Sequence, residues 1–576
     1  MSHTRCEDRH AFSHRRWNPA GATRWLRLAA LTALGPLATV TACDGDASPA
    51  PQAARTTLLT TGSVELLGDG LSACSHQPAM AGAHAPERWC AFSRGHTRGQ
   101  PADLWVVNLD RARAGQAPCD GTSPNCVQLT STLWTGDPVF SPAHPYVHGF
   151  FGDTLLYYAD STSGNGEDAF EGTIWAWRPG MAQGRVVSGA RGYYCFGDTR
   201  AASVACLSNQ GNVPTTGAAS SALEFDLLGG PVEGGPVGPL PLIERIRPYD
   251  PDGSLVWGTA FSPNGEWFTL ATKVADMDDA GKARPVQALR IVPAKELGQT
   301  APREILRDVD HWIPTPDSSK ILFVRDAIKD AFGETTATLM VADFPSGANP
   351  TQLATGISRY EVYGEPGGPT KGIGLFQNVG EDLSSFRIMS DLAHPEKLIT
   401  IAPHVDDAVV SPDLRYSFFQ DANEKGETIS VVARNDGSGK CVLNQNAGQG
   451  AYSVKFLPKF NRVIWAEDST GSAASGASIE GWLGNPDSCA GAQRFSTRLG
   501  YYQPTAEGLI YGETDAASIS MVLRYARFTG SGLGKPVELT SRSGLTNALV
   551  DGSYIVFTVS EGPNTTAGLY VHGPLP

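Results

Sequence analysis

The chain has 576 residues, a formal net charge of −14 at pH 7 and 18% charged residues. No run of basic residues occurs beyond the N-terminal region, which argues against nucleic acid as a partner because such binding needs clustered Lys and Arg. The acidic balance itself indicates a solvated surface rather than a particular ligand.

The first 42 residues have the build of a secretion signal. Six arginines precede a charge-free stretch over residues 28–42, which is the order of a basic region followed by an apolar region. This stretch is broken by Gly35 and Pro36, and it is shorter than the about 20 residues that a membrane-spanning helix needs. We therefore expect a signal peptide over residues 1–42 and an exported protein.

The signal ends in Val40-Thr41-Ala42-Cys43. This segment resembles the lipobox of bacterial lipoproteins, in which an aliphatic residue and two small residues precede a cysteine. The resemblance implies that Cys43 carries a diacylglycerol and an N-acyl chain, and two or more chains anchor a protein stably. It predicts a lipoprotein of the bacterial cell envelope, in either the inner or the outer membrane. The alternative is an ordinary cleaved signal with an incidental cysteine.

A short polar segment follows the proposed lipid site. Residues 44–54 read DGDASPAPQAA, a composition typical of a flexible tether, and the folded part is expected over residues 55–576. Loss of the signal removes six arginines and two acidic residues, so the net charge becomes −18.

Eight cysteines remain after the signal is removed and Cys43 is lipidated. An even number in an exported protein predicts disulfides. A zinc site is the alternative, but no two cysteines are separated by only two residues. Local spacing favours the pairs Cys74–Cys90, Cys119–Cys126 and Cys195–Cys206. This leaves Cys441 with Cys489, which lie near the ends of neighbouring modules.

A repeated turn runs through the chain. Its clearest copy is Ser262-Pro263-Asn264-Gly265, with residue types that favour a type I turn at the first, second and fourth positions. Two degenerate modules lie between residues 192 and 246 and between 360 and 403; once they are counted, the repeat length is 46 to 60 residues. Related turns begin at Ser141, Thr315, Ser411 and Leu457.

The segments after each turn follow one order. An apolar strand, a polar loop and a third strand such as DLWVVNLD (from Asp103) precede a short fourth strand such as PTQLAT (from Pro350). Four strands in roughly 50 residues, bounded by Gly, Pro and Asn, form the pattern of a propeller blade. The predicted fold class is therefore all-β, a β-propeller of four-stranded blades. A β-sandwich is the alternative, but it does not predict a fixed four-stranded unit.

This repeat resembles the WD40-like repeat of the TolB family, which has a strand, a Ser-Pro-Asp-Gly turn, an aromatic strand and a third strand reading like LYVVDL. The resemblance covers most of residues 86–576. It implies the propeller fold but no particular function, because unrelated proteins share such blades. TolB has an α/β domain before its propeller, and the segment between Cys43 and the first predicted blade leaves no room for one, so TolB's partners are not carried over.

About ten modules can be counted, the first from residue 86 and the last, over 545–576, with only three strands. The segment RTTLLTTG (from Arg55) resembles the closing strands elsewhere, and we expect it to complete the last blade and so remove the open edges of the ring. Most propellers have four to eight blades. Eight to ten modules therefore predict either one large ring or two rings.

Few residues in the sequence indicate a catalytic, metal-binding or ligand-binding site. No G-x-S-x-G motif and no following α/β segment support a Ser-His-Asp hydrolase, and we expect no catalytic residue, no metal site and no cofactor. His404, Asp406 and Asp407 precede a predicted inner strand and are the candidates for binding at the channel.

The leading interpretation is a non-catalytic binding or scaffold protein for a protein or glycan ligand. The alternative is a propeller enzyme, either a metal-dependent polysaccharide lyase or a hydrolase, that acts through the central channel.

Overall fold

The computed structural model describes the strands and part of the connections of the region after the predicted tether. The signal peptide, Cys43, the tether and Cys74 lie outside the described residues. The residues described are 55–61, 64–66, 88–94, 102–113, 119, 125–133, 147–151, 154–159, 173–188, 191–198, 203–209, 225–231, 239–246, 260–277, 283–329, 335–380, 383–423, 425–443, 450–468, 478–505, 507–514, 521–530, 532–551, 554–561 and 566–573.

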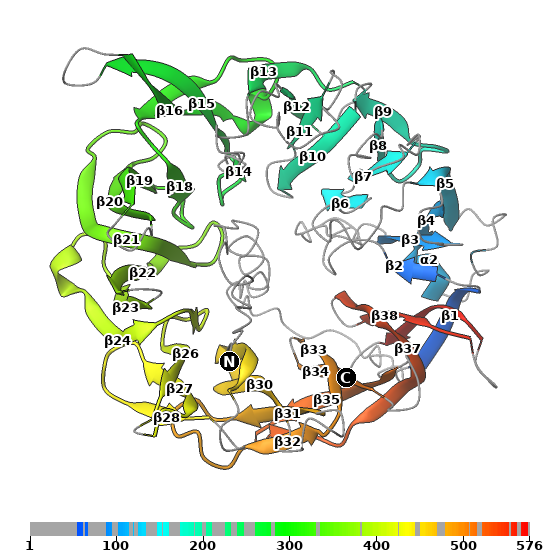
Figure 1. The fold of residues 1–576 in the computed structure, drawn as a ribbon. Coiled ribbons are helices and arrows are strands. Elements are labelled where there is room, and N and C mark those ends of the chain that lie inside the picture. Colours follow the sequence, from blue (N-terminus) through cyan, green and yellow to red (C-terminus); the bar gives the residue numbers. More distant parts are fainter. Residues whose placement is uncertain are drawn as a thin grey trace, which may run out of the picture.

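The strands pair antiparallel in four-stranded blades. Six blades are separate sheets, and each of the two larger sheets contains two blades that share one continuous strand. Figure 1 shows the blades arranged around a ring, with the first strand of a blade toward the centre. This is clear for β6 (Val147–Phe151), β14 (Ala260–Phe261), β18 (His311–Pro314) and β33 (Leu499–Pro504). The ten blades confirm the predicted all-β propeller of four-stranded blades.

The first five blades are built as follows. Blade 1 contains β2 (Val64–Leu66), β3 (Trp89–Arg94), β4 (Ala102–Asn108) and β5 (Cys126–Leu133); blade 2 contains β6 (Val147–Phe151), β7 (Thr154–Ala159), β8 (Thr173–Trp177) and β9 (Arg185–Ser188); blade 3 contains β10 (Arg191–Asp198), β11 (Ser203–Asn209), β12 (Phe225–Pro231) and β13 (Leu242–Ile246); blade 4 contains β14 (Ala260–Phe261), β15 (Trp267–Met277), β16 (Ala283–Pro293) and β17 (Arg303–Arg307); blade 5 contains β18 (His311–Pro314), β19 (Lys320–Lys329), β20 (Thr335–Asp343) and the first part of β21 (Thr351–Gly364).

The other five blades continue the same order. Blade 6 contains the second part of β21, β22 (Thr370–Gly380), β23 (Leu383–Met389) and β24 (Ile399–Val405); blade 7 contains β25 (Ala408–Val410), β26 (Tyr416–Ala422), β27 (Thr428–Arg434) and β28 (Lys440–Val442); blade 8 contains β29 (Tyr452–Leu457), β30 (Arg462–Asp468), β31 (Ile479–Gly484) and β32 (Gln493–Ser496); blade 9 contains β33 (Leu499–Pro504), β34 (Gly508–Thr514), β35 (Met521–Thr529) with β36 (Gly532–Leu533) beside it, and the first part of β37 (Val537–Asp551); blade 10 contains the second part of β37, β38 (Tyr554–Val559), β39 (Gly568–Gly573) and β1 (Arg55–Thr61).

Helical segments are short. The described chain has α2 (Leu109–Arg113) after β4, and the 3-10 turns η2 (Ala294–Glu296), η3 (Pro395–Lys397) and η4 (Pro458–Phe460). Within this part of the chain, no helix has the length and apolar character needed to cross a membrane.

Strand β21 is shared by two blades. Its first part pairs with β20 and its second part pairs with β22, and the change of partner takes place at Ile357. Gly356, directly before this point, has a φ of +67°, a conformation that glycine adopts without steric cost. This glycine lets one continuous strand pass from the outer edge of blade 5 to the inner edge of blade 6.

Apolar side chains hold neighbouring blades together. Residues alternate between the two faces of a strand, so Leu375 of β22 belongs to the cluster between blades 5 and 6 whereas Phe376 belongs to the cluster between blades 6 and 7. Ten such clusters follow one another round the ring, one at each interface between blades.

The N-terminal strand lies in the last blade, as the sequence predicted. β1 pairs antiparallel with β39, and Leu59 of β1 is 1% exposed in a cluster that includes Phe92 of blade 1 and Val571 of blade 10. The backbone of Cys119, which precedes β5, donates to the Leu59 oxygen at 2.8 Å and accepts from Thr60 Oγ1 at 3.0 Å. Blades 1 and 10 are therefore joined through both packing and hydrogen bonds.

The recurring turn has one geometry in blades 4, 5 and 7. The Ser or Thr hydroxyl donates to the carboxylate or amide oxygen two residues on and accepts the N–H five residues on, and the fourth residue has positive φ. The three copies are Ser262 with Asn264, Trp267 and Gly265; Thr315 with Asp317, Lys320 and Ser318; and Ser411 with Asp413, Tyr416 and Leu414.

Three disulfides have both cysteines in the described residues. Two of them are local, Cys119–Cys126 next to β5 and Cys195–Cys206 across β10 and β11, and the third, Cys441–Cys489, joins blade 7 to blade 8. Cys90 is also disulfide-bonded, and its expected partner Cys74 is outside the described region.

Candidate functional site

The three predicted channel residues occupy the passage from blade 6 to blade 7. His404 is exposed on β24, the outermost strand of blade 6, and exposed Asp406 and Asp407 connect β24 to β25. Asp407 directly precedes the innermost strand of blade 7, and its side chain contacts a polar group on blade 6.

That polar group comprises Arg359, Glu361 and Tyr363, which alternate along the second part of β21. We call these three residues and Asp407 the inner-strand cluster. The intervening Tyr360 and Val362 pack against blade 5, whereas Tyr363 packs in the interface with blade 7. The strand alternation therefore directs Arg359, Glu361 and Tyr363 to the blade 7 side of the innermost strand.

Arg359 is the centre of the inner-strand cluster. It forms an ion pair with Asp407, and its Nε lies 3.8 Å from Glu361 Oε1. Its guanidinium carbon is 3.7 Å from the ring centroid of Phe376, a cation–π arrangement. The Tyr363 hydroxyl donates to Glu361 Oε2 at 2.6 Å. The buried Nε of Arg359 has no hydrogen-bond partner among the described residues, so the arginine retains donor capacity.

A glycine on the neighbouring strand makes room for this arrangement. Gly374 of β22 is opposite Glu361, and a Cβ at this position would lie 3.1 Å from the rings of Tyr363 and Phe386. Contacts this close would displace Tyr363, and with it the hydroxyl that donates to Glu361.

The electrostatics of the cluster are mixed. Burial raises the pKa of Glu361, and this effect outweighs the opposite influence of Arg359. Burial and the adjacent carboxylate raise the pKa of Tyr363 well above its usual value. The side chains of Arg359 and Glu361 remain 35% and 34% exposed, and that of Asp407 is 55% exposed. A ligand can therefore reach a guanidinium and two carboxylates.

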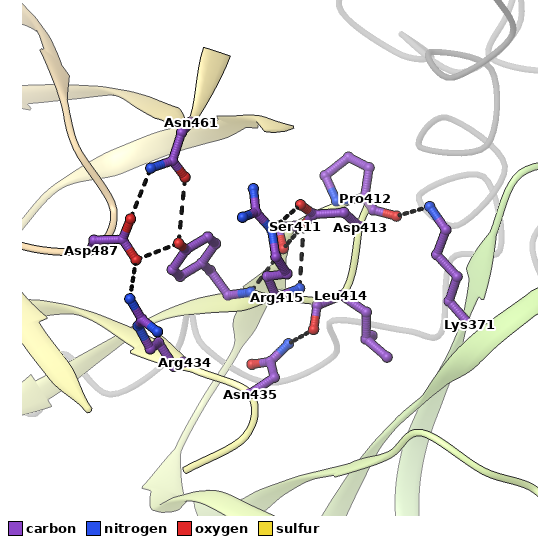
Figure 2. Close-up of polar contacts among 11 residues, drawn as sticks. Lys371, Ser411, Pro412, Asp413, Leu414, Arg415, Arg434, Asn435, Asn461 and Asp487 are labelled. Carbon is purple, nitrogen blue, oxygen red and sulfur yellow. Dashed lines mark hydrogen bonds and ion pairs between the residues drawn. The ribbon is translucent and has the colours of Figure 1, made fainter. Parts of the chain in front are cut away.

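A second polar network lies between blades 7 and 8 and is shown in Figure 2. Asp487 accepts hydrogen bonds from the hydroxyl of Tyr416 at 2.5 Å and from Asn461 Nδ2 at 2.8 Å, and it forms an ion pair with Arg434. The hydrogen bond from Tyr416, with those from Asn461 and Arg434, lowers the pKa of Asp487. Protein groups satisfy both carboxylate oxygens, so this network is assigned to holding the blades together.

His311 occupies a comparable position on the innermost strand of blade 5. Its Nδ1 lies 3.1 Å from the Tyr360 hydroxyl, and burial lowers its pKa to about 4. The imidazole is therefore neutral at pH 7, and the pair connects the inner strands of blades 5 and 6.

The sequence pointed to Asp407 but not to Arg359, Glu361, Tyr363 or Asp487. The first three lie in a module whose turn motif has decayed. The strict alternation in RYEVYG, polar on one side and apolar on the other, is the signal that could have identified a half-buried strand with functional groups on one face.

No group of three or more His, Cys, Asp and Glu side chains among the residues with described placement is arranged to hold a metal ion. No protein-family model matches the chain. No curated protein matches it either.

Solved structures similar to this chain have low identity. A eukaryotic initiation factor is 9% identical with a TM-score of 0.43, and the match covers 70% of this chain and 90% of that chain. The β-propeller domain of the trilobed protease from Pyrococcus furiosus is 12% identical with a TM-score of 0.27, covering 60% and 94%. TolB from Acinetobacter baumannii is 11% identical with a TM-score of 0.22, covering 53% and 79%.

Proposed function

We propose that this protein is a lipid-anchored binding module of the bacterial cell envelope, held to the membrane through Cys43, whose propeller binds a protein or glycan ligand through the inner-strand cluster. The observation that carries the binding role is a partly exposed guanidinium with two carboxylates, one on the same inner strand and one directly before the inner strand of the next blade. The basic and apolar N-terminal segments and the small residues before Cys43 support the anchor.

The chemistry of the cluster suits recognition. Arg359 presents planar N–H donors, and Glu361 and Asp407 present acceptors, so hydroxyl, amide and ammonium groups of a ligand all find a partner. Because Arg359 is already positioned by Asp407 and by the Phe376 ring, binding requires little ordering of its long side chain.

Site-specific photocrosslinking tests the binding role and captures the ligand, whatever its identity. We would place p-benzoylphenylalanine at Asp406, beside the cluster, and at Val442, which is 46% exposed on the outer strand of blade 7. Illumination of cells should give a discrete adduct from position 406 and none from position 442. Arg359→Ala should abolish the adduct. Equal labelling from both positions, or no adduct from 406, would contradict binding at this surface.

The two carboxylates beside Arg359 favour one second candidate, a glycan hydrolase in which Glu361, whose pKa burial raises, is the general acid and Asp407 the second carboxylate. Release of reducing ends from envelope polysaccharides by the purified protein, lost in Glu361→Gln, would support this activity. A complete absence of product while the crosslink persists would leave binding as the function.

A further inference from the structure

Lys455 lies on β29, the innermost strand of blade 8, and is partly buried at the interface with blade 9. Its Nζ is 5.0 Å from the ring centroid of Tyr502 on β33, the innermost strand of blade 9. The position resembles that of the inner-strand cluster, because both groups lie where the inner strands of two successive blades meet.

The ammonium of Lys455 has no counter-ion among the described residues. Within that part of the chain it forms no ion pair and no hydrogen bond, although a lysine has three N–H donors. Asp468, an acidic residue of the same blade, accepts a hydrogen bond from the Tyr452 hydroxyl at 3.0 Å instead. Burial, with no contribution from a neighbouring charge, lowers the pKa of Lys455.

Tyr502 adds a second unused donor. It is 7% exposed, and its buried hydroxyl has no hydrogen-bond partner among the described residues. A buried hydroxyl without a partner is destabilising, so a ligand that accepts from it gains more than it would from a solvated donor. The aromatic ring stabilises the cation but leaves its N–H groups without an acceptor.

We propose that Lys455 and Tyr502 form an oxyanion subsite at the inner end of the interface between blades 8 and 9, which binds a carboxylate or phosphate group. An oxyanion supplies the counter-charge that Lys455 lacks and the acceptor that the Tyr502 hydroxyl lacks. The inference does not depend on the inner-strand cluster, because it arises from a different pair of blades and from a cation with no carboxylate beside it.

Reductive ¹³C-methylation followed by NMR tests the subsite directly. The dimethyl-lysine resonance of Lys455 is assigned by its loss in Lys455→Arg, and the protein is titrated with inorganic phosphate and, separately, with glucuronate, against chloride at matched ionic strength. We expect a saturable shift of the Lys455 resonance with at least one oxyanion. Lys440, exposed on the outer strand of blade 7, should follow ionic strength alone. Saturation by phosphate or by glucuronate identifies which oxyanion the subsite takes.

The matched variant is Tyr502→Phe, which keeps the ring beside Lys455 and removes the hydroxyl. It should weaken oxyanion binding about tenfold, the loss expected for one hydrogen bond to a charged acceptor. A Lys455 resonance that responds to both oxyanions no more than Lys440 would overturn the proposal. So would saturable binding that Tyr502→Phe leaves unchanged.

Discussion

The closing strand β1 should contribute far more to stability than its seven residues suggest. Leu59→Ala removes a side chain that is 1% exposed between blades 1 and 10. Truncation of a buried leucine to alanine costs about 2–5 kcal/mol, because the transfer free energy of the removed atoms is lost and a cavity is left behind. The control is Thr61→Ala, which changes an exposed side chain on the same strand and should alter stability by less than about 0.5 kcal/mol.

Deletion of residues 55–61 should have a larger and local effect. It removes the strand that pairs with β39, so that the edge of β39 is left unpaired. It also removes two hydrogen bonds to the backbone of Cys119, one accepted by the Leu59 oxygen and one donated by the Thr60 hydroxyl. Hydrogen exchange by mass spectrometry should show faster exchange in residues 568–573, together with a lower melting temperature and aggregation. Deletion of the tether, residues 44–54, should change none of these.

Two results would refute this reasoning. Unchanged protection of residues 568–573 after the 55–61 deletion would mean that β1 does not hold the last blade. Equal melting temperatures for the two deletions would mean that ring closure contributes nothing measurable to stability.

Four further predictions are independent of closure. Cys43→Ser should abolish palmitate labelling, and labelling that survives would exclude a lipid at this residue. Peptide mapping of the oxidised native protein should find Cys441 and Cys489 protected from alkylation; modification of either would argue against their disulfide. The pKa of His311 is about 4 in the folded protein and about 6.5 in the unfolded chain, so the unfolded chain takes up a proton first as the pH falls. The free energy of unfolding should therefore fall by up to about 3 kcal/mol between these two pH values. Denaturant titrations of His311→Gln should no longer show this pH dependence. Asp487, whose folded pKa is lowered, stabilises above its unfolded pKa near 4, so Asp487→Asn should show less loss of stability in acid than the parent chain.

The number of modules could be predicted to lie between eight and ten, because the repeat is a local signal, whereas the choice between one ring and two could not. A type I turn depends on four neighbouring residues, and strand order follows from the alternation between turns. The decayed modules were therefore recovered from the spacing of the turns together with their own strand segments. The strand over residues 64–66 was missed, and blade 1 begins there rather than at residue 86. Three residues are too few for alternation to be visible.

The inner-strand cluster depends on a property that no local pattern contains. Arg359 and Asp407 are 48 residues apart and belong to different blades, and they meet because β21 crosses from blade 5 to blade 6 and offers one face to blade 7. The sequence shows that residues alternate along β21, but the face that meets the next blade is set by the register with β22. The apolar face of β21 could be assigned to the core from the sequence, whereas the residues that its polar face contacts could not be identified.

The same alternation explains why polar side chains with unused hydrogen-bonding groups lie at the inner strands. Away from the centre, both faces of a blade are filled by apolar side chains of its neighbours, as at Leu375 and Phe376. The innermost strand lies at the edge of the blade that faces the centre of the ring. A polar side chain there packs against a neighbouring blade on one side and can keep contact with water, as the 35% exposure of the Arg359 side chain shows. Arg359 and Lys455 occupy this boundary at two different interfaces, one with carboxylates beside it and one without any among the described residues.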